Sequence, residues 1–239
     1  MSTTWETESL ECVPQWRINL PVGPQPESQN MAIIFEKRAN PAALGMAGFG
    51  VTTVLLSLVN AGILPAGGEG VVLPLAIFFG GLIQVIAGVL EYKERNTFGC
   101  TVFTSYGAFW MWFGFLVVLG TNGVLNLKTA DSTIGACLLL WALLTLGFLV
   151  ASFRLTRHLT ITVFGACVTL VLLGFWKILE APWLHTVGGW AGIITGLLAM
   201  YGSSAVLING EMGRSVLPPR LSHGRTSRSP ARRAADREK

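Results

Sequence analysis

The sequence of 239 residues is short of charge. Only 13% of the residues are Asp, Glu, Lys or Arg, whereas about 25% is usual for a globular domain, and 51% are apolar. This little charge cannot cover the surface of a water-soluble protein of such length. The charged residues also gather in short gaps between long apolar stretches. These features predict a polytopic membrane protein and exclude a collagen-like, disulfide-stabilised, nucleic-acid-binding or disordered chain.

The sequence also lacks the residues that catalysis and metal binding require. None of the motifs H-E-x-x-H, G-x-S-x-G, C-x-x-C or the Walker loop occurs, and the three histidines fall at predicted helix ends or in the C-terminal tail. The four cysteines have no paired spacing, so we interpret them as reduced packing residues. We therefore predict no catalytic residue, no metal and no cofactor. A path across the membrane is the main candidate function that remains.

Six apolar stretches are each about as long as the roughly 20 residues that a helix needs to cross a bilayer. They cover residues 41–62, 71–92, 99–120, 132–153, 159–179 and 187–208. Their apolar residues do not alternate with polar ones as they would in barrel strands. The predicted fold is therefore all-α, a bundle of six transmembrane helices.

The basic residues predict the orientation of this bundle. Fifteen of the 17 Lys and Arg residues fall on one side of the predicted spans, and only Lys128 and Lys177 fall on the other. The positive-inside rule then places both termini in the cytoplasm. We expect a cytoplasmic tail over 1–39, a transport domain over 40–213 and a basic, disordered cytoplasmic tail over 214–239. The basic tail fixes topology, and attraction to anionic lipid is an alternative role for it.

Polar residues mark one face of the first predicted helix. Asn40 is a favoured N-cap before Pro41, and the free N–H groups of such a helix start can attract an anion, although a well-capped helix needs no ligand. Phe49, Thr53 and Asn60 share a face at helical spacing. They suit a narrow, partly wet pathway, and hydrogen bonding between helices is the alternative.

The second predicted helix carries an amide and a carboxylate. Gln84 lies deepest in the stretch, and Glu91 lies near its cytoplasmic end. A buried Glu91 could couple transport to protons. We favour an interfacial ion pair with Lys93 or Arg95, because both are so near in sequence.

The third predicted helix has two contrasting faces. Thr104 belongs to a face of hydroxyls and small residues, whereas Tyr106 and Trp110 belong to an aromatic face. Only one face can line a pathway, and periodicity alone leaves both open. Tyr106 combines a ring that can narrow a pore with a hydroxyl that can donate to a carboxylate.

Several ordered motifs resemble those of the acetate uptake transporter family, also called the succinate–acetate permeases. They are N-P-A-A-L-G at 40–45, F-G at 49–50, G-G at 80–81 with Gln84, A-G at 87–88, E-Y at 91–92, N-T-F-G at 96–99, F-T-S-Y-G-A-F-W at 103–110, G-W at 189–190 and A-x-Y from Ala199 to Tyr201. The resemblance runs from residue 40 to about residue 218. One departure is Ala43, which stands where the family usually has a second proline.

The resemblance implies six transmembrane helices per subunit, a homohexamer and one substrate pathway through each subunit. It implies passage of acetate, succinate and related small carboxylates, described for the family both as proton symport and as an anion channel. The family's pore narrows at a Phe, a Tyr and an aliphatic residue, usually Leu. Phe49 and Tyr106 match the first two, which favours the aromatic face of the third helix, and counting from Trp141 places Ala166 at the third. The smaller Ala166 predicts a wider neck that passes lactate or propionate better. Besides these three constriction residues, the predicted pathway residues are Asn40, Thr53, Asn60, Gln84, Glu91, Thr104 and Ala199.

We therefore predict a transporter of acetate and other small carboxylates in the plasma membrane, with the lipid bilayer as its surroundings. No ionisable residue is predicted at mid-membrane depth, so we favour a passive pathway in which any proton moves as acetic acid or through Glu91. A membrane sensor acting through its tails and a transporter of ammonium are the alternatives. A cation pathway would favour acidic rings, which the sequence lacks. An enzyme is the least favoured class.

Overall fold

The computed structural model describes residues 39–127 and 129–217. The chain divides into two units, Met1–Ala39 and Asn40–Lys239, and every described helix belongs to the second. The two predicted tails lie almost entirely outside the described residues. The tail predictions and the position of the termini relative to the membrane stay predictions.

Six described helices are long and apolar enough to cross a membrane. They are α2 (Ala42–Asn60), a second span over Ala66–Lys93, α5 (Thr97–Thr121), α6 (Asp131–Ser152), α7 (Arg157–Leu179) and α8 (Pro182–Met212). The described residues contain no strand. The predicted all-α bundle of six membrane-spanning helices is confirmed.

The second span is interrupted where the sequence predicts one regular helix. It consists of η1 (Ala66–Gly68), α3 (Glu69–Leu75), the π-helix η2 (Ala76–Ile83) and α4 (Gln84–Lys93). Pro74 lies inside α3, where it supplies no N–H and its ring crowds the preceding turn, and the wider π turns follow directly. The π segment also lies close to α2, because a Cβ on Gly48 would be 2.6 Å from the carbonyl oxygen of Phe79. This segment leads into Gln84.

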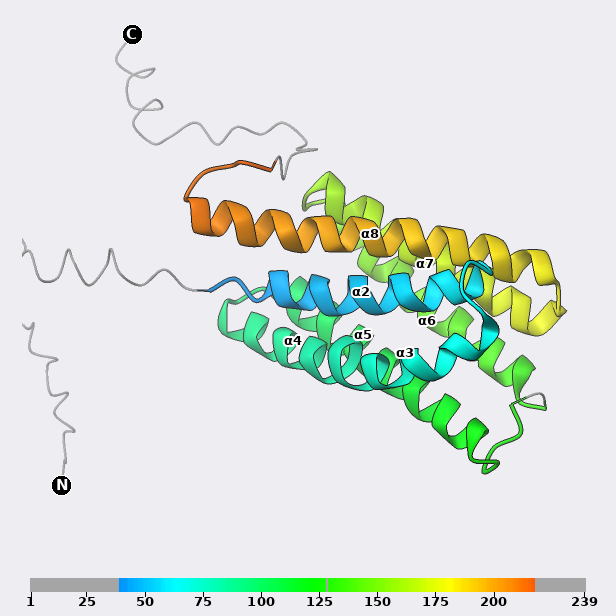
Figure 1. Cartoon of the computed structure of the whole chain (residues 1–239). Helices are drawn as coiled ribbons and strands as arrows, with labels where there is room; N and C mark the ends of the chain where they lie inside the picture. Colours follow the sequence, from blue (N-terminus) through cyan, green and yellow to red (C-terminus); the bar gives the residue numbers. More distant parts are fainter. Residues whose placement is uncertain (1–38, 128, 218–239) are drawn as a thin grey trace, which may run out of the picture. The chain divides into compact units, whose positions relative to one another are not determined.

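Glycines bring α8 against α2, and the two helices run side by side (Figure 1). A Cβ on Gly196 would lie 2.8 Å from the backbone oxygen of Gly50, and one on Gly192 would meet the Ser57 hydroxyl. The glycines at 188, 192 and 196 form a small-residue stripe that the sequence predicts as a packing surface, and in this structure the stripe packs within the chain. The other main pairs are α6 with α7, α7 with α8, and α4 with α5.

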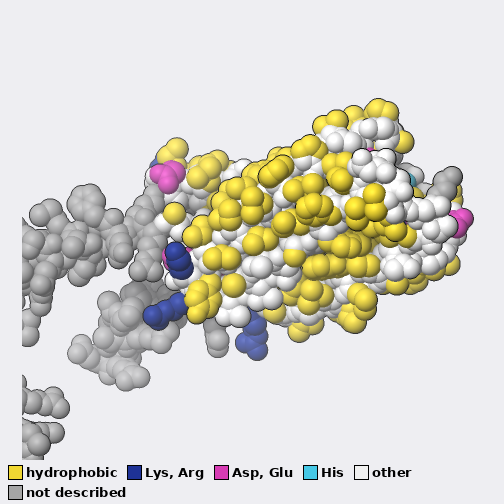
Figure 2. Space-filling model, turned by 90° about the horizontal axis from the view of Figure 1, so that it is seen from below, with side chains coloured by type: hydrophobic (Ala, Val, Ile, Leu, Met, Phe, Trp, Pro, Cys, Tyr) yellow, Lys and Arg dark blue, Asp and Glu magenta, His cyan; other side chains and the backbone are white. Residues whose placement is uncertain are grey.

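The outer surface is apolar, as a bilayer requires. Figure 2 shows hydrophobic side chains over the middle of one face, with charged side chains toward its ends. Large apolar side chains such as Leu140 and Val150 are more than half exposed. Polar side chains such as Thr52, Thr145 and Gln84 are instead buried between the helices.

Candidate functional site

Two cavities lie inside the bundle and share three lining residues. The large cavity, of about 180 Å³, extends toward the end of the bundle where α2 finishes at Asn60, here called the Asn60 end. The small cavity, of about 30 Å³, lies on the side where α2 begins. Phe49, Tyr106 and Ala166 line both cavities. The three residues that the sequence places at a constriction therefore lie where the two cavities adjoin.

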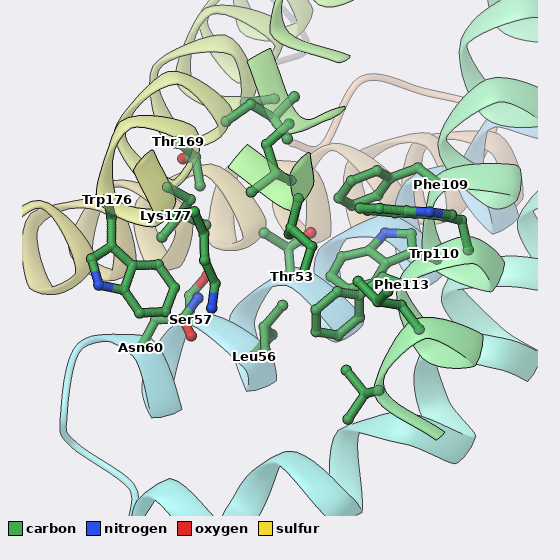
Figure 3. Close-up of a pocket in the computed structure, with 18 of the residues that line it drawn as sticks. Thr53, Leu56, Ser57, Asn60, Phe109, Trp110, Phe113, Thr169, Trp176 and Lys177 are labelled. Carbon is green, nitrogen blue, oxygen red and sulfur yellow. The ribbon is translucent and has the colours of Figure 1, made fainter. Parts of the chain in front are cut away.

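Aromatic rings dominate this layer. The Phe49 and Tyr106 ring centres are 5.1 Å apart, and the Phe148 ring packs edge-on against Tyr106 at 6.0 Å. Tyr106 comes from the aromatic face of α5, which also sends Trp110 and Phe113 into the large cavity (Figure 3). Thr104, on the other face, lines neither cavity and lies against Gly88 of α4.

The Tyr106 hydroxyl bonds to a residue that the sequence analysis did not select. Tyr106 Oη lies 2.9 Å from Thr145 Oγ1, and Thr145 Oγ1 lies 2.8 Å from the carbonyl oxygen of Trp141. A carbonyl only accepts, so when Thr145 donates to Trp141 its oxygen accepts the proton of Tyr106. In that arrangement the Tyr106 proton points to α6, and the ring faces the pathway. A polar residue in the apolar stretch 132–153 is the signal that could have identified Thr145.

Most hydroxyls in the large cavity already donate to their own helix. Thr53 donates to the Phe49 carbonyl at 2.6 Å, and Thr169 and Thr195 donate to the carbonyls four residues earlier at 2.8 Å each. These hydroxyls therefore turn lone pairs, not protons, toward the cavity. Asn60 differs, because its Oδ1 lies 3.1 Å from His185 Nε2 and accepts its proton, and its amide nitrogen carries two further donors.

The small cavity contains a buried amide with no internal partner. Gln84 is fully buried and lines this cavity, and neither its amide oxygen nor its amide nitrogen has a hydrogen-bond partner among the described residues. Leaving such a group unpaired costs about 1–3 kcal/mol. Ala199, another predicted pathway residue, lies in the same lining. Gln84 thus offers both donors and an acceptor to a polar molecule beneath the constriction.

Besides Thr104, two of the predicted pathway residues lie away from both cavities. Asn40 lines neither and caps α2, its Oδ1 accepting from the Ala42 amide at 3.0 Å. Glu91 is buried and lines neither cavity. Its Oε2 accepts from Asn96 Nδ2 at 2.7 Å, and its Oε1 has no partner among the described residues. The favoured ion pair of Glu91 with Lys93 or Arg95 was wrong, because the carboxylate turns inward to the α4–α5 turn.

A polar cluster that the sequence analysis did not assign to the pathway lies at the Asn60 end of the large cavity. The Trp176 and His185 rings stack at 3.8 Å with an interplanar angle of 16°. Lys177 Nζ lies 4.4 Å from the Trp176 ring centre and 2.7 Å from Asp131 Oδ1. Trp176, Lys177 and His185 all line the cavity (Figure 3 labels the first two). The described residues contain no group of three or more His, Cys, Asp or Glu that could hold a metal.

Comparison with known proteins identifies relatives of this chain in sequence and in structure. The chain is 38% identical to the succinate-acetate/proton symporter SatP of Escherichia coli K12, over 78% of this chain and 98% of that protein. It is 36% identical to ammonia transport outward protein 2 of Saccharomyces cerevisiae, over 71% of this chain and 61% of that protein. A solved structure described as that of the bacterial acetate channel SatP matches with a TM-score of 0.72 and 38% identity, over 76% of this chain and 98% of that one.

These relatives are membrane transport proteins, not enzymes, and this chain is a multi-pass protein of the plasma membrane. The family model for GPR1/FUN34/yaaH proteins matches residues 23–221, which is most of the chain. The resemblance on the motifs between residues 40 and 201 is therefore confirmed, and the chain belongs to the GPR1/FUN34/yaaH family.

Proposed function

We propose that this chain carries acetate and related small carboxylates, succinate among them, across the plasma membrane. The observation that carries the proposal is the layer of Phe49, Tyr106 and Ala166 between two cavities in a chain 38% identical to SatP. A path that narrows at two rings and one small side chain selects small solutes. The small cavity next to this layer, at about 30 Å³, also restricts the path to small solutes.

The polar groups along this path suit a carboxylate that crosses by weak binding. Desolvating a carboxylate is costly unless donors replace the water. Asn60 and Gln84 supply amide donors on either side of the constriction, and the hydroxyls between them are mostly occupied by their own helices. Weak binding at several places allows a solute both to enter and to leave.

We favour passive movement over a dedicated proton relay. Relays in membrane proteins use chains of Asp, Glu or His. Among the described residues, Glu69 and His185 are the only Asp, Glu or His side chains that line the large cavity, none lines the small cavity, and Glu91 lines neither. Protons would then move as the neutral acid.

Ala166 is proposed to widen the constriction toward larger monocarboxylates. It is buried in the layer and contributes only a methyl group. The change Ala166→Leu would fill that space, and we expect it to lower the ratio of lactate to acetate uptake several-fold. Equal ratios for the wild type and the variant would contradict this role.

We also propose that this chain forms a homohexamer, as its resemblance to the family implies. Large apolar side chains such as Phe78 and Leu140 are exposed on the single subunit. They would contact neighbouring subunits or lipid. The mass of the purified protein in a mild detergent tests the number of subunits.

Flux into liposomes that contain the purified full chain tests the function. Acetate flux that follows an imposed voltage, without pH dependence beyond the ionisation of acetate, supports an anion channel. Concentrative uptake driven by a pH gradient supports symport, and Glu91→Gln would then be the first variant to examine. Flux of ammonium without flux of acetate would overturn the proposal. It would favour ammonia transport, the activity after which the yeast relative is named. Deletion of residues 1–35 and 215–239 should preserve the flux, whereas a sensor acting through its tails would lose its output.

A further inference from the structure

One positively charged side chain lines the proposed path. Among the described residues in the walls of the two cavities, Lys177 is the only Lys or Arg. It lies at the Asn60 end of the large cavity, and its side chain is 23% exposed. Because the proposed substrate is an anion, the position of this ammonium group matters for entry. The inference below rests on the proposed function.

The Lys177 ammonium is held from two sides. Asp131 Oδ1, at the start of α6, lies 2.7 Å from Nζ, and the Trp176 ring lies beneath it at 4.4 Å. The ammonium has three protons, and these two neighbours do not use all of them. Asp131 itself does not line the cavity. The cation therefore lines the cavity, whereas its carboxylate partner does not.

The Trp176 ring, which packs against Lys177, connects it to a second hydrogen-bond donor, Asn60. Trp176 stacks on His185, and His185 bonds to Asn60, which lies on the opposite helix α2. Lys177 and Asn60 thus line the same end of the cavity (Figure 3). A carboxylate at this mouth meets an ammonium and an amide, both of which are hydrogen-bond donors, whereas Glu69, the one carboxylate among the described lining residues, opposes this attraction.

The ion pair with Asp131 is weak enough to be exchanged. Both side chains are about a quarter exposed, and ion pairs near a protein surface contribute little net stability. An incoming carboxylate can replace Asp131 at Nζ with little net cost. A bare lysine would hold the anion longer, and slow release would limit flux.

We propose that Lys177 forms a carboxylate-recruiting site at the Asn60 end of the large cavity, and that Asp131 is a built-in competitor that keeps this site weak. The ligand class is a small carboxylate anion. A purely structural pair joining α6 to α7 makes a different prediction. Loss of either partner would then impair the protein in the same direction.

The test compares Lys177→Gln with Asp131→Asn in liposomes that contain the full chain. The initial rate of acetate uptake is measured against acetate concentration. We expect the half-saturating concentration to rise about fivefold in Lys177→Gln and to fall about threefold in Asp131→Asn, as expected for charge-assisted bonds. Lys177→Arg keeps the charge and should stay close to the wild type. Lys93→Gln removes the same charge from an exposed residue outside both cavities and serves as the matched control.

Opposite shifts in the two variants support the recruiting site. Shifts in the same direction, or no shift in Lys177→Gln, would overturn it while the proposed function stands. If the wild type conducts no acetate, the proposed function fails, and the site is tested on purified protein by the rise in Tm that acetate causes. That rise should be lost in Lys177→Gln and enlarged in Asp131→Asn, and an equal rise in all three proteins would refute the site.

Discussion

Replacing Thr145 by Val should destabilise the protein through Tyr106. Valine keeps the shape of threonine and removes the hydroxyl that receives the Tyr106 proton. Thr145 is fully buried and Tyr106 is 4% exposed, so on the side of Thr145 no bulk water is in contact with the pair. An unpaired buried donor costs about 1–3 kcal/mol. At about 2 kcal/mol, the expected loss in Tm is roughly 4–8 °C for a chain of this length.

The change Tyr106→Phe should cost less, because Thr145 keeps its bond to the Trp141 carbonyl. In the double variant Tyr106→Phe/Thr145→Val, no unpaired hydroxyl remains. Removing both partners together can be nearly neutral, so the two single costs should not add, with a coupling of about 1–2 kcal/mol. Thr145→Ser keeps the hydroxyl and is the matched control.

Thermal unfolding of the four variants in detergent measures this coupling. If the two single effects add, the hydroxyls of Tyr106 and Thr145 are not paired as the structure shows. A Thr145→Ser variant as unstable as Thr145→Val would also refute the reasoning, since keeping the hydroxyl would then give no advantage over removing it.

Three further predictions concern packing, the α4–α5 turn and the buried amide. Gly196→Ala places a Cβ 2.8 Å from a backbone oxygen of α2 and should lower Tm strongly, whereas Gly210→Ala on the same helix meets nothing within 4 Å and should leave Tm unchanged or raised. Asn96→Ala removes the N-cap of α5 and the hydrogen bond to Glu91, and it should lower the free energy of unfolding by about 1–2 kcal/mol. A variant as stable as the wild type would show that these bonds contribute little. Gln84→Met should raise Tm, because it removes an unpaired amide, and should lower acetate flux, so a gain or no change in flux would exclude Gln84 from the pathway.

The helices could be predicted from sequence because they depend on local composition. All six stretches of apolar residues correspond to spanning helices, and their limits differ by a few residues. The second span is the exception in regularity. Pro74 predicts that the helix is irregular. The form of the irregularity, a π segment, depends on how closely Gly48 of α2 approaches this span. That approach is a property of the packed bundle.

Some of the pathway residues could be predicted from local sequence, and others could not. Phe49, Tyr106 and Gln84 stand in motifs, so their positions could be read along the chain, and all three line the cavities. Thr145 and Lys177 act through partners 39 and 46 residues away in sequence. A pairing at that distance appears only when the helices are packed. Lys177 served in the sequence analysis only to orient the bundle.

The direction of hydrogen bonds is the last feature that the sequence does not reveal. Thr53 and Thr169 appear in the sequence as polar groups that could bind a solute, yet each gives its only proton to its own helix. The lining side chains that keep unused N–H protons are instead the amides of Asn60 and Gln84, the indole of Trp110 and the ammonium of Lys177. A pathway with several hydroxyls in its lining can therefore be poor in donors along most of its length. For an anion this means few and separate resting places, which is the arrangement that rapid passage requires.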